Sequence, residues 1–254
     1  MLVLISCAKT MDAHKAGCAP FVSSPLFLKE ARQIAGQLSS LTVEELEKLL
    51  RVNKKIAAEN KLRYLDFSVG GCKGTAALLA YDGIVFKKLC PEDFSDSDFR
   101  YAQEHLRITS FMYGLLRPLD SILPYRLEGN VKLPEYGGMT MFEFWREKLT
   151  ELLINDVKRA GGTLCNLASG EMRGLFDWAR VKKEVRIVTP EFKVDKDGKL
   201  KTVVVYTKMM RGEMTRYILK NRIENPDLLK GFESAEGFSY SLRHSTADYP
   251  IFTI

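Results

Sequence analysis

The sequence predicts a mixed α/β fold, in which a mixed sheet is flanked by helices within one domain spanning residues 1–254. Three observations favour this fold class. Short continuous apolar runs alternate with amphipathic helical segments over the first two thirds of the chain, and a strong hairpin signal follows them. No internal repeat, low-complexity tract or linker divides the sequence. Its 254 residues are enough to bury a sizeable core.

The strands are predicted from apolar content and from the turns beside them. Residues 2–5 and 164–167 are short continuous apolar runs, as expected of buried strands. Asp197-Gly198 lies between two alternating segments, which predicts a hairpin with a primed turn. The predicted strands are 2–5, 106–113, 164–167 and the hairpin arms 185–194 and 200–207, with 76–81 open between a strand and a short helix.

The helix boundaries are predicted from caps and breakers. Thr42, with Glu45 three residues later, forms a capping box at the start of one helix. Gly161-Gly162 ends an amphipathic helix, and Pro226 stops the last helix. The predicted helices cover about 24–38, 42–60, 96–104, 142–159, a segment that starts near 171, and 212–223.

Composition argues against several classes of protein. The chain is 46% hydrophobic and 28% charged and has no apolar run of membrane-spanning length, so we expect a cytoplasmic protein without a membrane partner. Residues 2–5 are too short for the core of a signal peptide. The cysteines are odd in number and scattered, which argues against a disulfide framework or a zinc site. They are Cys7, Cys18, Cys72, Cys90 and Cys165, and the three distant histidines are His14, His105 and His244.

Familiar catalytic signatures are absent from the sequence. It contains no GxSxG, Walker, GxGxxG, HExxH or kinase motif. Neither histidine pairs nor carboxylates cluster at ligand spacing, so we predict no metal site, no cofactor and no direct binding of iron.

The stretch 105–129, HLRITSFMYGLLRPLDSILPYRLEG, is the most informative part of the chain. Its apolar residues are interrupted by Arg107, Tyr113, Arg117, Asp120, Tyr125, Arg126 and Glu128. Because arginine is seldom buried without a partner and suits bidentate binding of phosphate, the pattern predicts the wall of a polar cavity. The alternative is a closed network in which Arg117 pairs with Asp120 and Arg126 pairs with Glu128.

Polar residues also lie at the ends of three predicted strands. Ser6, Lys9 and Thr10 follow the first strand, Asn166 and Ser169 lie at the end of the strand at 164–167 and just after it, and the turn at 113–120 follows a third strand. Ligands bind at the carboxyl ends of strands in open α/β sheets, so these residues are expected to converge on one pocket. They could instead only cap turns. The thiol of Cys7, next to the Lys9 cation, is expected to have a lowered pKa.

The positive charge is concentrated in one segment. Basic residues outnumber acidic residues by 14 to 7 between 171 and 222, whereas the rest of the chain has 24 against 25. Such a segment indicates an anionic partner, with nucleic acid the leading candidate, or else a solvated face that binds nothing. Within it, Arg211, Arg216, Lys220 and Arg222 fall on one predicted helix.

Several of these motifs carry a family resemblance. The opening SCAKT, the block LRPLD…PYRLE, Phe144-Trp145, NLAS at 166–169 and RGEMTRYILKNR at 211–222 together resemble the YaaA family of peroxide-stress-resistance proteins. The similarity runs in matching order to Gly231-Phe232. The chain departs from the family pattern at Cys7, where proline is usual, and in the tail after Gly237, which lacks an acidic and Ser-rich ending.

The resemblance implies a cytoplasmic protein of the response to hydrogen peroxide that limits iron-mediated oxidative damage to DNA. It also implies binding of double-stranded DNA through a positively charged cleft and a helix-hairpin-helix element. By position, this element would be the two helices between 29 and 61, hinged at 39–41, although the usual glycine-containing hairpin is missing there.

Two functions remain open from the sequence. The first is binding of double-stranded DNA, non-specific or damaged. The second is a glycosylase-like enzyme on nucleobases or damaged DNA, for which a nucleotide or nucleobase is the ligand. Lys9 and Ser6 are its candidate catalytic residues, with Lys9 acting only if burial depresses its pKa. The predicted nucleic-acid or anion-binding residues are Arg107, Tyr113, Arg117, Tyr125, Arg126, Asn166, Ser169, Lys208, Arg211, Arg216 and Arg222.

Overall fold

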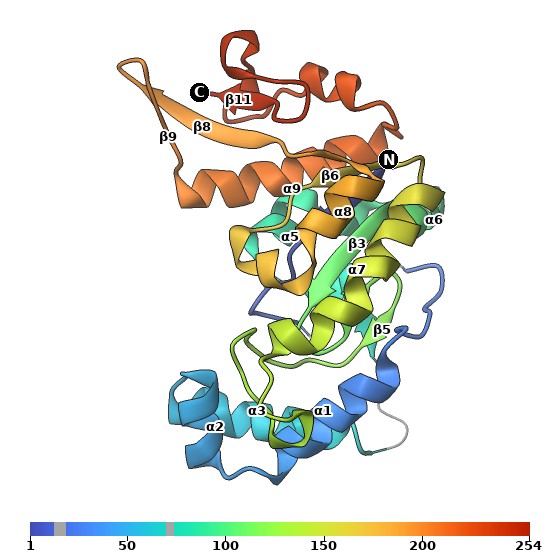
Figure 1. The fold of residues 1–254 in the computed structure, drawn as a ribbon, viewed down its shortest axis with the longest axis vertical. Coiled ribbons are helices and arrows are strands. Elements are labelled where there is room, and N and C mark those ends of the chain that lie inside the picture. Colours follow the sequence, from blue (N-terminus) through green and yellow to red (C-terminus); the bar gives the residue numbers. More distant parts are fainter. Residues whose placement is uncertain (13–18, 70–73) are drawn as a thin grey trace.

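The computed structural model describes residues 1–12, 19–69 and 74–254, and it confirms the mixed α/β fold (Figure 1). His14, Cys18 and Cys72 lie outside the described residues. The three N-terminal helices occupy one end of the molecule, a small sheet occupies the other end, and the main sheet lies between them.

The main sheet has the strand order β4-β3-β1-β6-β7. Its strands are β1 (Leu2–Ile5), β3 (Leu106–Ser110), β4 (Gly114–Leu116), β6 (Thr163–Asn166) and β7 (Arg186–Val188). β1 is parallel to both β3 and β6, and β7 is parallel to β6, whereas β4 runs antiparallel to β3. Every residue of β1 is buried, which agrees with its continuous apolar sequence.

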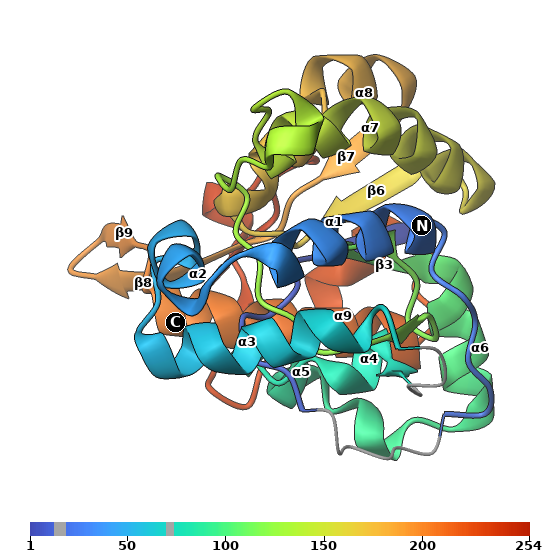
Figure 2. The ribbon, with the colours of Figure 1, turned by 90° about the horizontal axis from the view of Figure 1, so that it is seen from below.

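Helices cover both faces of this sheet. In Figure 2, α7 (Met141–Arg159) and α8 (Trp178–Glu184) lie on one side, and α6 (Asp96–His105) and α9 (Val204–Lys220) lie on the other. α5 (Ile84–Leu89) packs along α9. Smaller pieces complete this region. They are β2 (Thr75–Ala76), α4 (Ala77–Ala80), β5 (Ser121–Ile122) and three 3₁₀ helices, Pro91–Asp93, Pro134–Tyr136 and Gly170–Leu175.

The second sheet has the order β10-β11-β8-β9. Its strands are β8 (Glu191–Lys196), β9 (Lys199–Lys201), β10 (Ser239–Tyr240) and β11 (Ile251–Thr253), and the 3₁₀ helices Pro226–Gly231 and Leu242–His244 lie beside them. The tail after Phe232, which shows no clear period in the sequence, thus contributes two strands. The aromatic rings of Phe192, Phe232 and Phe252 pack together and bury this sheet against α9.

The N-terminal helices are α1 (Leu28–Ser40), α2 (Val43–Leu50) and α3 (Lys54–Asp66). The predicted capping box is confirmed, because Thr42 and Glu45 exchange both hydrogen bonds. The single helix predicted over 42–60 is wrong: Arg51 adopts a left-handed conformation with φ 53° and ends α2, and Asn53 caps α3. The segment 29–61 therefore holds three helices instead of two, with a joint at the predicted hinge and a second joint at Arg51.

Two strand predictions need correction. The strand over 106–113 stops at Ser110, because the Ser110 hydroxyl accepts the backbone N–H groups of Met112 and Tyr113 and turns the chain into β4. The hairpin forms at Asp197-Gly198, but its arms are shorter than predicted. β7 and β8 are separate strands in different sheets, and the second half of 200–207 belongs to α9.

Three helix predictions also need correction. α1 begins at Leu28 instead of 24, because Ser23 is held extended by backbone hydrogen bonds to Leu119 and Ser121. The helix expected from 171 is the 3₁₀ helix Gly170–Leu175 followed by α8. The helix expected over 212–223 begins eight residues earlier, at Val204.

Candidate functional site

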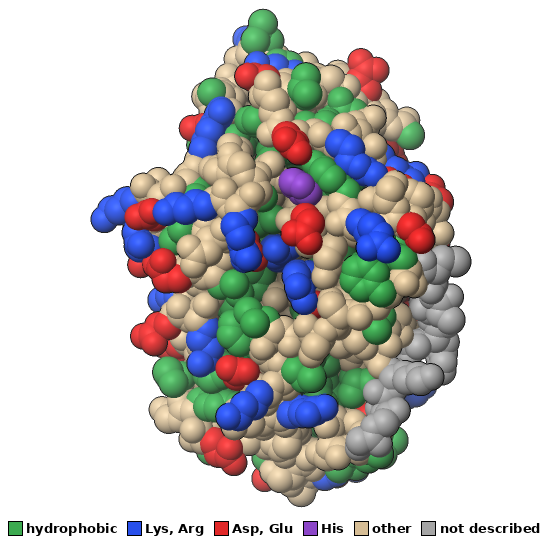
Figure 3. All heavy atoms as spheres, turned by 90° about the vertical axis from the view of Figure 1, so that its right-hand side faces the viewer, with side chains coloured by type: hydrophobic (Ala, Val, Ile, Leu, Met, Phe, Trp, Pro, Cys, Tyr) green, Lys and Arg blue, Asp and Glu red, His purple; other side chains and the backbone are tan. Residues whose placement is uncertain are grey.

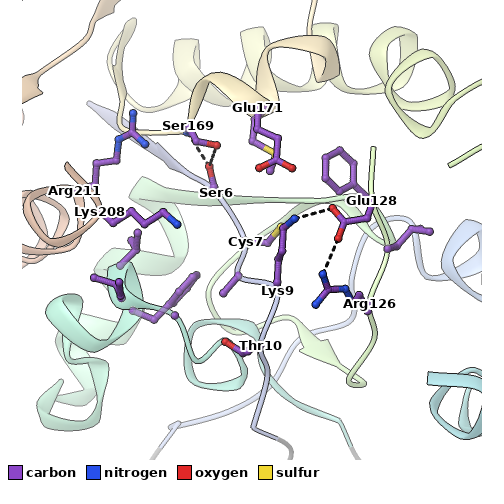
Figure 4. Close-up of a pocket in the computed structure, with 18 of the residues that line it drawn as sticks. Ser6, Cys7, Lys9, Thr10, Arg126, Glu128, Ser169, Glu171, Lys208 and Arg211 are labelled. Atoms are coloured by element: carbon purple, nitrogen blue, oxygen red, sulfur yellow. Dashed lines mark hydrogen bonds and ion pairs between the residues drawn. The ribbon is translucent and has the colours of Figure 1, made fainter. Parts of the chain in front are cut away.

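A cavity of about 300 Å³ lies at the carboxyl ends of β1 and β6, where the sequence predicts a pocket (Figure 4). Its walls come from six separate parts of the chain, namely the loop after β1, the start of α5, Phe111 after β3, residues 125–128, the segment after β6, and α9. The loops after β1 and β6 are in direct contact, as predicted. The Ser6 hydroxyl donates to the Ser169 hydroxyl at 3.2 Å and accepts the backbone N–H of Ser169 at 2.8 Å.

One wall carries a shared carboxylate. Glu128 forms salt bridges to Lys9 at 3.1 Å and to Arg126 at 3.2 Å (Figure 4). The predicted Arg126–Glu128 pair is therefore present. Both residues line the cavity, so the pair is part of an open cavity wall. The Lys9 side chain is 58% exposed, so the burial required of a nucleophilic lysine is absent.

The opposite wall carries two cations from α9. Lys208 and Arg211 line the cavity, and among the described residues neither forms a salt bridge or a side-chain hydrogen bond. Desolvation lowers the pKa of Arg211, and no carboxylate counteracts this effect. Arg211 also lines an adjoining cavity of about 220 Å³, together with Asn166 and Ser169.

The Cys7 thiol lies in the cavity wall, and its pKa is raised. Burial raises its pKa to about 12, and the carboxylates Glu171 and Glu128 add to the rise more than Lys9 opposes it. The lowered pKa expected from the neighbouring Lys9 is wrong, because the sequence does not reveal the two carboxylates that the fold brings to the same place.

Arg107 and Arg117 lie away from this cavity. The Nε of buried Arg107 donates to Asp156 at 2.6 Å, and Arg117 pairs with Asp120 at 3.0 Å. For these two arginines the closed-network alternative applies. They border a different hollow of about 420 Å³ near the ends of α6 and α7. Figure 3 views the right-hand side of Figure 1, and on that face basic side chains are interspersed with acidic ones.

The cations at the end of α9 are also neutralised. Arg216 pairs with Asp93 at 2.6 Å, Lys220 pairs with Asp98 at 2.9 Å, and Arg222 pairs with Asp98 at 2.7 Å. Arg211 is thus separated from the other three cations predicted with it. Part of the surplus counted along the sequence is therefore cancelled in the fold, because carboxylates from the start of α6 and from the 3₁₀ helix before it pair with these three cations.

The two tyrosines predicted to bind nucleic acid are largely enclosed. Tyr113 is 1% exposed, and its hydroxyl accepts the Leu123 N–H at 2.9 Å. Tyr125 lines the cavity, but its hydroxyl is bonded to Ser110 at 2.6 Å and to Tyr81 at 2.8 Å. Both tyrosines are buried, and Tyr113 packs against Tyr125 in the cavity wall with 5.7 Å between their ring centroids.

A second, more open hollow of about 500 Å³ adjoins the first and shares Lys9, Arg126 and Glu128 with it. It adds Lys48 and Arg51 from the joint between α2 and α3, and Lys132 from the segment before α7. We call this hollow the basic groove; its five cations are Lys9, Lys48, Arg51, Arg126 and Lys132. Sequence reasoning missed three of them, because single exposed cations in separate segments give no local pattern.

Across residues 1–12, 19–69 and 74–254, no three His, Cys, Asp or Glu side chains cluster as metal ligands would. Within the same residues, no helix combines the length and the apolar character needed to cross a bilayer.

Comparisons with known proteins agree with the motifs. A family model described as peroxide stress protein YaaA matches residues 1–244. A UPF0246 protein of Bacteroides fragilis is 60% identical over 253 residues, covering 100% of this chain and 98% of the relative. UPF0246 proteins of Porphyromonas gingivalis and Crocosphaera subtropica are 48% and 38% identical, each covering 94% of both chains.

Proposed function

Because this chain belongs to the peroxide stress protein YaaA family, its role lies in the oxidative stress response, and we propose that it acts there by binding double-stranded DNA in the basic groove. Protein bound along the duplex would shield it from radicals generated by iron. Limitation of iron-mediated DNA damage would be a consequence of this binding.

The composition of the groove carries the proposal. Five cations surround one hollow that contains a single carboxylate, Glu128. Lys48, Arg51 and Lys132 are exposed and form no salt bridge within the described part of the chain. Duplex DNA offers one negative charge per roughly 1.7 Å of helix axis, so unpaired cations in one groove match its backbone.

The joint between α2 and α3 supports the same proposal. The left-handed conformation of Arg51 places this side chain at the tip of a tight turn between two helices. Such a turn resembles the helix-hairpin-helix expected from the family resemblance, but it lies at 51–53 instead of 39–41. Contacts of this type fix the position of a protein on the phosphate backbone without reading the base sequence.

Salt-dependent binding tests the proposal. We expect fluorescence anisotropy of a labelled duplex to give a log–log slope of affinity against salt near −3 to −4, since about four phosphates would be neutralised. Combining Lys48→Gln, Arg51→Gln and Lys132→Gln should lower the affinity at least tenfold and reduce the slope by about 2 to 3.

The matched control removes three positive charges elsewhere. Lys182, Lys183 and Lys199 are exposed and lie outside the groove, so Lys182→Gln, Lys183→Gln and Lys199→Gln together change the net charge equally. This control variant should bind duplex DNA within about threefold of the parent. A flat salt profile, or an equal loss in the control variant, would reject the groove as the DNA-binding surface.

A further inference from the structure

Arg211 is exceptional among the arginines of this protein. In the part of the chain that the structure describes, every other arginine that is not fully exposed pairs with a carboxylate. These arginines are Arg63, Arg107, Arg117, Arg126, Arg180, Arg216 and Arg222. Arg211 is half-buried at the cavity and has no such partner. Removing a charge from water without a counterion is costly, so the missing counterion points to a ligand.

The backbone of α9 holds Arg211 in this place. A Cβ at the next residue, Gly212, would lie 2.2 Å from the Val85 carbonyl oxygen, so only glycine permits this approach of α9 to α5. The close contact directs the preceding turn of α9 toward the cavity. Lys208 lies three residues before Arg211 on the same face, and both side chains line the cavity (Figure 4).

Two further groups at the same cavity can donate to an anion. The hydroxyl of Ser169 accepts from Ser6, which leaves its own proton free for a ligand. The Nε–H of Arg126 is buried and has no acceptor in the described structure. Two unpaired cations with additional donors suit a phosphate better than a single carboxylate.

The opposite end of the cavity has different chemistry. Glu171 lies across from Lys208 in Figure 4, and within the described residues it forms neither a hydrogen bond nor a salt bridge. A carboxylate can only accept hydrogen bonds, so it selects a ligand with N–H donors. The cavity is also lined by the apolar side chains of Phe86, Phe111 and Met172.

We infer that this cavity binds one nucleotide, with its phosphate on Lys208 and Arg211 and the amino edge of its base on Glu171. The inference deepens the proposed function and rests on it in part, since cavity and groove share Lys9, Arg126 and Glu128. A phosphate at one end, a flat ring in an apolar slot and N–H donors at the other end are the features of a nucleotide. Guanine, cytosine and adenine carry the exocyclic amino group, and thymine does not.

Calorimetric titration with the four deoxynucleoside 5′-monophosphates tests the inference. We expect dGMP, dCMP and dAMP to bind more tightly than dTMP, and Arg211→Gln to weaken dGMP about tenfold or more. Glu171→Gln should reduce the preference for dGMP over dTMP. The control Arg243→Gln, an exposed arginine outside the cavity, should leave all affinities unchanged.

Thermal unfolding without nucleotide gives a readout independent of binding. Because Arg211→Gln removes an uncompensated charge, this variant should be folded and have a Tm at least equal to that of the parent. Saturating dGMP should then raise the Tm of the parent more than that of the variant. A variant with a lowered Tm would show that Arg211 has a structural partner and would overturn the argument.

The nucleotide could be free or part of a DNA strand, and a second measurement distinguishes these sources. A duplex containing 2-aminopurine becomes more fluorescent when the base leaves the stack. If the parent raises the 2-aminopurine fluorescence, and Arg211→Gln abolishes this rise but still binds the duplex by anisotropy, the ligand is a nucleotide within DNA. Binding of dGMP without any 2-aminopurine change identifies a free nucleotide. Absence of both signals rejects the inference, whereas loss of duplex anisotropy alone rejects only the groove.

Discussion

At the residue scale, the Cys7 thiol shows how neighbours distant in sequence determine chemistry. Its sequence neighbour Lys9 favours a thiolate, but burial and the carboxylates of Glu171 and Glu128 favour the neutral thiol more strongly. A protein of the peroxide response is expected to hold reactive cysteines only where the thiolate is stabilised. Cys7 is therefore part of the cavity wall, and we expect its thiol to react slowly with peroxide.

Alkylation tests this conclusion. With a pKa of about 12, only about one Cys7 in ten thousand is a thiolate at pH 8, so iodoacetamide should leave Cys7 unlabelled in the folded protein. The labelling rate should rise about tenfold per pH unit up to pH 10, and guanidinium should restore ordinary labelling. Peptide mass spectrometry measures each case. Rapid labelling of Cys7 in the folded protein at pH 8 would contradict the raised pKa of its thiol.

At the element scale, α9 begins eight residues before its predicted start, and it supplies two cations, Lys208 and Arg211, to the cavity. The β-branched residues at 203–205 favour a strand, yet α9 begins at Val204. Packing of the helix against α5 explains the difference, because tertiary contacts outweigh the small differences in intrinsic propensity. Gly212 permits this contact, and Lys208 and Arg211 reach the cavity as a result.

Two glycine substitutions compare helix propensity with close packing. Gly212→Ala should lower the free energy of unfolding by about 2 kcal/mol, because the new Cβ would overlap the Val85 carbonyl. Gly36→Ala in α1 has nothing within 4 Å and should raise the free energy of unfolding by roughly 0.5–1 kcal/mol. Urea denaturation measures both. Equal effects of the two substitutions would show that α9 and α5 can move apart without cost.

At the scale of the whole molecule, α9 also joins the main sheet region to the second sheet. Its end is attached to α6 through Asp98, which accepts from Lys220 and Arg222. Burial alone would raise the pKa of Asp98, but these hydrogen bonds and those from Ser95 hold it well below its usual value of 3.8. The Asp98 carboxyl group is therefore fully ionised at neutral pH, where it pairs with Lys220 and Arg222.

The stability contributed by Asp98 should depend on pH. A carboxyl whose pKa is lower in the folded state stabilises the protein above the unfolded pKa and loses this contribution as the pH falls. Asp98→Asn should lower the free energy of unfolding by about 2 kcal/mol at pH 7. The difference from the parent should begin to shrink below pH 4. Denaturation at several pH values measures it, and a difference that grows toward acid would contradict the pairing.

An exposed pair provides the control for this series. Asp227 and Lys230 form a salt bridge of 2.7 Å at the surface, where solvent screens the interaction. Asp227→Asn should leave the unfolding curve unchanged at every pH. A comparable loss in this variant would indicate that net charge, and not the attachment of α9 to α6, determines the pH dependence.

The local signals of the sequence determined local structure. The capping box at Thr42 and the turn at Asp197-Gly198 form because each depends on contacts within a few residues. The strand at 2–5 also forms where its continuous apolar run predicts it, although its partners β3 and β6 are distant in the sequence. The motifs after β1 and β6 also identified the cavity, since parallel strands bring their carboxyl ends to one edge of a sheet. Two of the five motifs that carry the family resemblance, SCAKT and NLAS, are these same segments.

Only the tertiary structure decided which cations are available. Arg107 and Arg216 are neutralised by Asp156 and Asp93, which lie 49 and 123 residues away in sequence, whereas Arg211 on the same helix as Arg216 has no partner in the described chain. Likewise, Lys48, Arg51 and Lys132 become a groove only when α2, α3 and the segment before α7 are packed together. Charge acts through space, and the distance between two charges in space is set by the fold and not by their separation along the chain.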